Sequence, residues 1–179
     1  QMCIRDRSIS PRKSPDSFLW SRASGFQLTQ EEQQAMKVII GSDHAGYDLK
    51  EEIRNYLAEK GTYSIKDVGA FNREPVDYPL IGHELAKQVA DGSFTRGILI
   101  CGSGIGMSIV ANRHARVRAA LCHDLYTVRL SRKHNDANVL VLGGRVLGTG
   151  LALEMVELFL STDFEGGRHL RRVEEIDSE

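Results

Sequence analysis

The sequence predicts an α/β protein built on a doubly wound, five-stranded parallel sheet and ending in a C-terminal helix. From residue 36 onward, short apolar runs alternate with segments whose apolar residues recur at helical spacing. Helices of this length between consecutive strands require crossover connections, and such connections make the strands parallel. A parallel sheet of this kind is covered by helices on both faces.

The elements follow one another in a regular order. The apolar runs predict strands at residues 37–43, 63–69, 96–102, 118–124 and 138–144. Helical spacing predicts helices at residues 49–61, 80–92, 106–114, 125–135 and 149–161. A last amphipathic segment, 168–179, carries Leu170, Val173 and Ile176 on one stripe. That stripe needs a surface to cover it, from its own chain or from a partner.

The first 35 residues differ from the rest of the chain. They mix Arg, Ser, Pro and Gln without a sustained period, which predicts a disordered or non-native leader. Acidic residues such as Asp6 and Asp16 argue against a transit peptide, which is poor in acid. Met36, directly before the first strand, looks like the natural start. We therefore expect a leader at 1–35 and one folded domain at 36–179.

The overall composition argues against several classes of protein. The net charge is −1, so the chain lacks the basic field that favours binding to nucleic acid or to an anionic membrane. No apolar run approaches the roughly 20 residues that span a bilayer. The three cysteines, Cys3, Cys101 and Cys122, form no CxxC pair, which fits a reducing compartment. We expect a cytoplasmic protein without a nucleic-acid or membrane partner.

In a doubly wound sheet the ligand binds outside the carboxyl ends of the strands, where the strand order reverses. The predicted strand ends carry Asp43, Asp67, Cys101, Asp124 and Arg145. The functional site is therefore expected among these residues and their neighbours.

The stretch CGSGIG, residues 101–106, combines a thiol with a glycine-rich loop. Gly102, Gly104 and Gly106 allow backbone N–H groups to face one point, which stabilises an anion or a developing oxyanion. The same groups favour the thiolate form of a neighbouring thiol, so Cys101 is a candidate base or nucleophile. By position alone, Cys101 is also interpretable as a small buried apolar residue that closes a strand.

Two pairs of polar residues stand at other element ends. Asp43 and His44 follow the first strand, where Asp43 could instead cap the next helix. His134 and Asn135 end a helix before the last strand, where they could instead form a C-cap with a solvated histidine. Both pairs are candidates for polar contacts to a ligand.

Positive charge is concentrated near the C-terminus. Arg168 and Arg172 are four residues apart on one helical face, a spacing suited to two guanidinium groups holding one phosphate. The alternative is a solvated face on which these arginines pair with Glu174 and Glu175. No histidines or carboxylates have the tight spacing of metal ligands, so no metal site is expected. The candidate groups together outline a site for a small phosphorylated substrate.

Five ordered segments carry a resemblance to a known family: GSDHAGYDLK, DYP, GILICGSGIGMSIVANR, LSRKHNDANVLVLGGR and EGGRHLRRV. From Met36 to about Ile176, the chain resembles the type B ribose-5-phosphate isomerases, a family shared with galactose-6-phosphate isomerase subunits. The resemblance implies a Rossmann-like three-layer sandwich that interconverts ribose 5-phosphate and ribulose 5-phosphate in the non-oxidative pentose phosphate pathway. It also implies no metal or cofactor, and a homodimer, or a tetramer formed by two dimers, with sites at the interface.

The resemblance further implies roles for the candidate residues. Cys101 would move a proton between C2 and C1 of the sugar through a cis-enediolate, and Ser103 would hold the enediolate oxygen. His134, assisted by Asp43, would open the furanose ring. The resemblance implies further substrate contacts of three kinds. The loop would contribute Gly102, Gly104, Ile105 and Gly106, and Asn135 would contact the sugar. The phosphate would be bound by His44, Arg145, Arg168 and Arg172.

Two alternatives to this function remain open at the level of sequence. The same chemistry could act on a six-carbon sugar phosphate, such as allose or galactose 6-phosphate. The chain could instead be a nucleotide-binding regulatory module that uses the glycine-rich loop only as a phosphate cradle. One branch of the isomerase family places a glutamate in this loop. Here Ile105, Gly106 and Met107 supply no carboxylate, which leaves Cys101 as the candidate base of the segment.

Overall fold

The structure, a computed structural model, describes residues 35–178. The leader predicted at 1–35, apart from Ala35, and Cys3 lie outside the described residues.

The described chain alternates strands and helices as predicted. The strands are β1 (Met36–Ser42), β2 (Tyr63–Asp67), β3 (Arg96–Cys101), β4 (Ala119–Leu121) and β5 (Val139–Gly143). The helices are α1 (Tyr47–Lys60), α2 (Tyr78–Ala90), α3 (Ile105–Ala111), α4 (Leu125–Asn135), α5 (Thr149–Ser161), the 3₁₀ turn η1 (Gly167–His169) and α6 (Leu170–Ile176).

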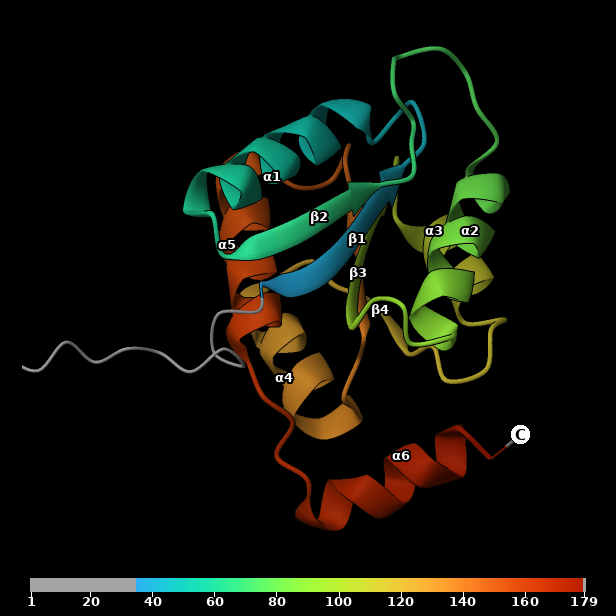
Figure 1. Ribbon diagram of the computed structural model, residues 1–179, viewed down its shortest axis with the longest axis vertical. Helices are drawn as coiled ribbons and strands as arrows, with labels where there is room; N and C mark the ends of the chain where they lie inside the picture. The colour runs from blue at the N-terminus through green and yellow to red at the C-terminus, as the bar shows by residue number, and fades with distance from the viewer. Residues whose placement is uncertain (1–34, 179) are drawn as a thin grey trace, which may run out of the picture. The chain divides into compact units, whose positions relative to one another are not determined.

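The strands form one parallel sheet in the order β2-β1-β3-β5-β4. Helices α1, α4 and α5 pack on one face, and α2 and α3 pack on the other (Figure 1). The predicted doubly wound, three-layer α/β fold is therefore confirmed.

Side-chain alternation along the strands builds both apolar layers. In β1, Val38 and Ile40 pack against the α1 side while Ile39 packs against the α2 side, and all three are fully buried. Successive strand residues point to opposite faces, so a strand covered on both faces needs apolar side chains at every position. Burial of each such side chain contributes about 1.5–3 kcal/mol.

The strand order places a crevice above the middle of the sheet. From β1 the chain moves to β2 at one edge, and β3 then lies on the other side of β1. The loops that follow β1 and β3 therefore leave in different directions. The space between such diverging loops is where doubly wound proteins bind ligands.

The C-terminal segment differs from the single amphipathic helix predicted at 168–179. It begins with the 3₁₀ turn η1 and continues as the short helix α6. Of the predicted apolar stripe, Val173 is buried, whereas Leu170 and Ile176 remain about half exposed. Within the described chain, the stripe is therefore covered only in part.

Within residues 35–178, no helix is both long enough and apolar enough to cross a bilayer.

Candidate functional site

A cavity of about 750 Å³ lies at the carboxyl ends of β1, β3 and β5. It unites most of the predicted strand-end residues from three separate loops. The predicted residues that line it are Asp43, His44, Cys101, Gly102, Ser103, Ile105, Gly106 and Arg145. Pockets of about 300–1,000 Å³ hold small ligands, so the volume suits a phosphorylated sugar.

Cys101 is the last residue of β3 and faces the helices α2 and α3. Its side chain is 5% exposed, and its Sγ accepts a hydrogen bond of 3.1 Å from the Gly104 backbone N–H. Cys101 therefore packs as a small apolar residue, and it also lines the cavity, with a backbone donor beside its sulfur. Its role as a base stays a prediction.

The loop after β3 directs its main chain toward the cavity. Ser103 Oγ accepts a hydrogen bond of 3.3 Å from the Ile105 N–H, which fixes the side chain over the loop. Among residues 35–178, the backbone N–H groups of Ser103 and Gly106 have no protein acceptor. Free N–H groups at a helix start are suited to binding a negatively charged oxygen.

Glycines allow the loops beneath the cavity to approach one another closely. Gly104 has φ +81, and a Cβ there would collide with the Leu121 side chain. A Cβ at Gly46 would lie 2.8 Å from the Ile100 carbonyl carbon, and one at Gly144 would lie 3.0 Å from the Ala45 oxygen. The floor of the cavity is therefore packed main chain against main chain.

We expect Gly104→Ala to lower the free energy of unfolding by about 2–5 kcal/mol, because left-handed backbone and overpacking each add a cost. Urea denaturation measures the change. Gly102→Ala is the matched control, because its Cβ would make only an ordinary contact of 3.6 Å with Ala45. Equal stability of the two variants would contradict the close packing beneath Gly104.

Asp43 and His44 are held by backbone donors. Asp43 is 7% exposed, and its Oδ1 accepts a hydrogen bond of 2.9 Å from the Gly46 N–H, so it closes the turn just before α1. His44 Nδ1 accepts a hydrogen bond of 3.3 Å from the Val76 N–H. In the neutral ring the proton then lies on Nε2, which makes the free nitrogen of His44 a donor.

Arg145 follows β5 and lies beside the glycine-rich loop. Its backbone N–H donates to the Gly102 oxygen at 3.0 Å, while the preceding N–H of Gly144 donates to the Cys101 oxygen at 2.8 Å. These bonds fix the β5 loop against the β3 loop. The exposed guanidinium of Arg145 adds a positive charge to the rim of the cavity.

His134, Asn135, Arg168 and Arg172 do not line this cavity. Helix α4 starts after the carboxyl end of β4 and returns to the amino end of β5. His134 and Asn135 therefore lie near the amino ends of the strands, whereas the cavity lies at their carboxyl ends. A strand of five residues separates the two ends by about 17 Å. Within a single chain, the predicted residues therefore form two groups rather than one site.

The second group surrounds a pair of histidines. The rings of His134 and His169 stack with centroids 4.2 Å apart, and Glu165 Oε2 lies 3.9 Å from His134 Nε2. Arg168 Nε donates to His169 Nε2 at 3.4 Å. Burial lowers the pKa of His169, and repulsion from His134, Arg168 and Arg172 lowers it further.

This group has donor atoms but not the geometry of a metal site. One ligand atom each from His134, Glu165 and His169 lies within 4.8 Å of the others. A metal ion lies in the plane of each imidazole that binds it, and two rings stacked at 7° share no such plane. Lys133 also pairs with Glu165 at 3.0 Å. The surplus of positive charge favours an anion here.

Sequence reasoning missed some residues and selected others that serve the fold. Tyr78, which starts α2, lines the cavity and packs its ring on Gly106. Its place within the DYP segment was the available signal. Two other strand-end carboxylates serve the fold: Asp67 pairs with the buried Lys50 at 2.5 Å, and Asp124 caps α4 by accepting from the Thr127 N–H at 2.8 Å.

Comparisons with known proteins identify the family and the relatives to which this chain is similar. Residues 38–176 match the family described as Ribose/Galactose Isomerase. Ribose-5-phosphate isomerase B of Escherichia coli is 47% identical over 140 residues, which cover 78% of this chain and 93% of that protein. D-erythrulose-4-phosphate isomerase of Pectobacterium atrosepticum is 44% identical over 145 residues, which cover 79% of this chain and 93% of that protein.

A solved structure extends the similarity to three dimensions. The crystal structure of a ribose 5-phosphate isomerase from Thermotoga maritima superposes with a TM-score of 0.79 at 46% sequence identity. The match covers 82% of this chain and 100% of that chain. The family match and this shared fold lead to one conclusion: the chain belongs to the ribose/galactose isomerase family.

Proposed function

We propose that this protein is an aldose–ketose isomerase that interconverts ribose 5-phosphate and ribulose 5-phosphate. The observation that carries the proposal is a cavity lined by Cys101, Ser103 and Gly106. The Cys101 sulfur accepts from the Gly104 N–H, and the N–H groups of Ser103 and Gly106 have no acceptor within residues 35–178. A base next to oxyanion donors is what proton transfer adjacent to a carbonyl requires. The regulatory-module alternative gives the thiol no role.

The proposed reaction is a proton transfer that needs no cofactor or metal. His134 opens the furanose ring, with Asp43 assisting at the ring hydroxyls. The Cys101 thiolate then removes the proton from C2 and returns it to C1, while a proton passes from O2 to O1. Ser103 and the loop amides hold the negative enediolate oxygen between these steps.

The phosphate and sugar contacts divide between the two groups of residues. His44 and Arg145 lie at the cavity, and Arg168 and Arg172 belong to the second group. Asn135 would contact the sugar from the end of α4. Guanidinium groups bind phosphate strongly through charge-assisted hydrogen bonds. One substrate can contact both sets of residues only if the two groups meet at one site.

We infer that a homodimer brings them together. About 17 Å of sheet separates the two groups in one chain, so a second chain must supply the missing half of each cavity. Exposed apolar residues lie at the cavity beside Cys101, where a partner would bury them: Ile105 is 55%, Ile109 53% and Val146 57% exposed. The free thiols of Cys101 and Cys122 fit the reducing cytoplasm.

The test is direct: purified protein is incubated with ribose 5-phosphate, and ribulose 5-phosphate is measured with and without a chelator. Turnover that a chelator does not reduce is the expected result. Allose 6-phosphate, galactose 6-phosphate and D-erythrulose 4-phosphate are run in parallel, because family members carry names for different sugar phosphates. Turnover confined to a hexose phosphate would favour the six-carbon alternative, and no turnover on any sugar phosphate would overturn the proposal.

A further inference from the structure

The two arginines of the second group lie on a segment that is tied to the end of α4. We call residues 165–177 the C-terminal strap. At its start, the Glu165 N–H donates to the Lys133 oxygen at 3.1 Å, and the Glu165 carboxylate pairs with the Lys133 side chain. The stack of His169 on His134 adds a second contact nearby. The first end of the strap is thus fixed to α4 just before Asn135.

The other end of the strap is tied to the same turn through Arg118. Asp177 Oδ2 accepts from Arg118 Nη1 at 2.6 Å. The Nε of that guanidinium donates to the backbone oxygens of Asn135 and Asp136, each at 3.1 Å, and its Nη2 pairs with the Asp136 carboxylate at 3.0 Å. Arg118 therefore joins the strap to the residues that follow His134.

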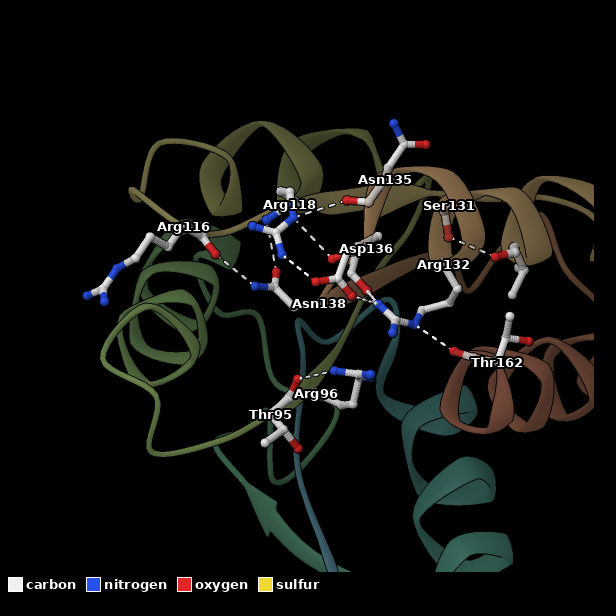
Figure 2. Close-up of polar contacts among 12 residues, drawn as sticks. Thr95, Arg96, Arg116, Arg118, Ser131, Arg132, Asn135, Asp136, Asn138 and Thr162 are labelled. Atoms are coloured by element: carbon white, nitrogen blue, oxygen red, sulfur yellow. Dashed lines mark hydrogen bonds and ion pairs between the residues drawn. The ribbon is translucent and has the colours of Figure 1, made fainter. Parts of the chain in front are cut away.

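The turn to which Arg118 binds is itself rigidly held. Arg132, 1% exposed, donates to Asp136 Oδ1 and to the Ala137 oxygen, each at 2.7 Å, and to the Thr162 oxygen at 3.1 Å. Figure 2 shows the guanidinium groups of Arg118 and Arg132 meeting on the Asp136 carboxylate. Arg132 is buried while Asp136 is one-third exposed, and several hydrogen bonds that share one carboxylate favour a single arrangement of the turn.

Little else holds the far end of the strap. Among residues 35–178, the Arg118–Asp177 pair is the only ion pair or side-chain hydrogen bond from the segment 170–178 to the rest of the chain. Ile176 and Asp177 border a cavity of about 540 Å³ rather than a packed core. The pair is partly buried, with side chains 13% and 25% exposed, so solvent screens it less than a surface pair.

We propose that the Arg118–Asp177 pair positions the phosphate-binding arginines, Arg168 and Arg172, relative to His134 and Asn135. This inference rests on the proposed function of these four residues. Asp177 and Arg118 are positioning residues that do not touch the substrate. Both ends of the strap are bound to the end of α4 and the turn that follows it. The distance between the two arginines and His134 is therefore fixed before substrate binds. This reduces the entropy lost on binding.

The test compares Asp177→Asn with the parent protein and with Glu175→Gln. The control makes the same carboxylate-to-amide change in the exposed Arg171–Glu175 pair of α6, the helix that ends just before Asp177. We expect Asp177→Asn to raise the KM for ribose 5-phosphate and the Kd for inorganic phosphate by about fivefold, with kcat within about twofold. Arg118 keeps Asp136 as a partner, so the melting temperature should stay close to that of the parent. Glu175→Gln should change none of these quantities.

Three further experiments distinguish failure of this inference from failure of the proposed function. Asp177→Glu should recover part of the phosphate affinity, because it restores the charge. Calorimetric titration with inorganic phosphate needs no turnover, so it tests the strap even if the parent protein does not isomerise ribose 5-phosphate. Arg172→Ala provides the reference for direct loss of a phosphate contact. Equal phosphate affinity of Asp177→Asn, Glu175→Gln and the parent would overturn the inference.

Discussion

Replacement of Cys101 by alanine should lower kcat for ribose 5-phosphate isomerisation by about 10²–10⁴-fold, the usual contribution of a positioned general base. KM should change little, because the phosphate and hydroxyl contacts of the substrate do not involve the sulfur. The Sγ that accepts from the Gly104 N–H is the proton carrier proposed for the cavity, and the loop from Ile105 to Met107 offers no carboxylate as a substitute.

Cys122→Ala is the matched control for this experiment. Cys122 is 2% exposed and packs in the apolar layer formed by α1, α4 and α5. Burial raises the pKa of the Cys122 thiol, so this cysteine stays neutral. The control variant should keep the parent kcat. A Cys101→Ala variant with kcat within threefold of the parent would remove the assigned base while leaving the isomerase activity itself intact.

Two inactive variants should restore activity to each other when they share a dimer. Cys101→Ala damages the cavity group, and His134→Ala damages the second group. In a mixed dimer, one site would receive both damaged halves, and the other would receive an intact cavity and an intact partner half. Doubly tagged mixed dimers, obtained by co-expression with two affinity tags, should therefore show roughly half of the parent kcat per dimer.

The pairing of Cys101→Ala with Asp43→Asn controls for this complementation. Both substitutions damage the cavity group, so each site of their mixed dimer carries one of them, and no recovery is expected. Recovery in both mixtures would mean that tagging or subunit exchange, rather than shared sites, produced the activity. No recovery in the first mixture would contradict the division of the site between two chains.

Local sequence signals placed some elements with high accuracy and others less well. The sequence predicts a helix at 125–135, and α4 spans these residues. Asp124 caps its start, and Asp136, with a positive φ, ends it. Strand β4 was predicted at 118–124 but spans only Ala119–Leu121. It is an edge strand that pairs with β5 alone, so one neighbour limits its length. The insertion of β5 between β3 and β4 has no local signal.

The candidate site was predictable to the extent that it depends on neighbouring residues. The environment of Cys101 follows from the strand that ends at Cys101 and from the loop that comes directly after it. The stacked rings of His134 and His169 come from two segments that are distant in the sequence. Neither the spacing of these residues nor the helical period predicts their contact. The division into two groups likewise follows from the direction in which α4 returns across the sheet, which is a property of the topology.

The main-chain floor of the cavity has a consequence for the design of new substrate preferences. Gly46, Gly104 and Gly144 have no space for even a methyl group, so their positions cannot be used to deepen or reshape the cavity. The rest of the cavity lining consists of side chains, such as Tyr78, which packs on Gly106. Libraries that aim to exchange a pentose for a longer or shorter sugar should vary such side chains, leave the glycines untouched, and keep Ile109 and Val146, which the proposed dimer would bury.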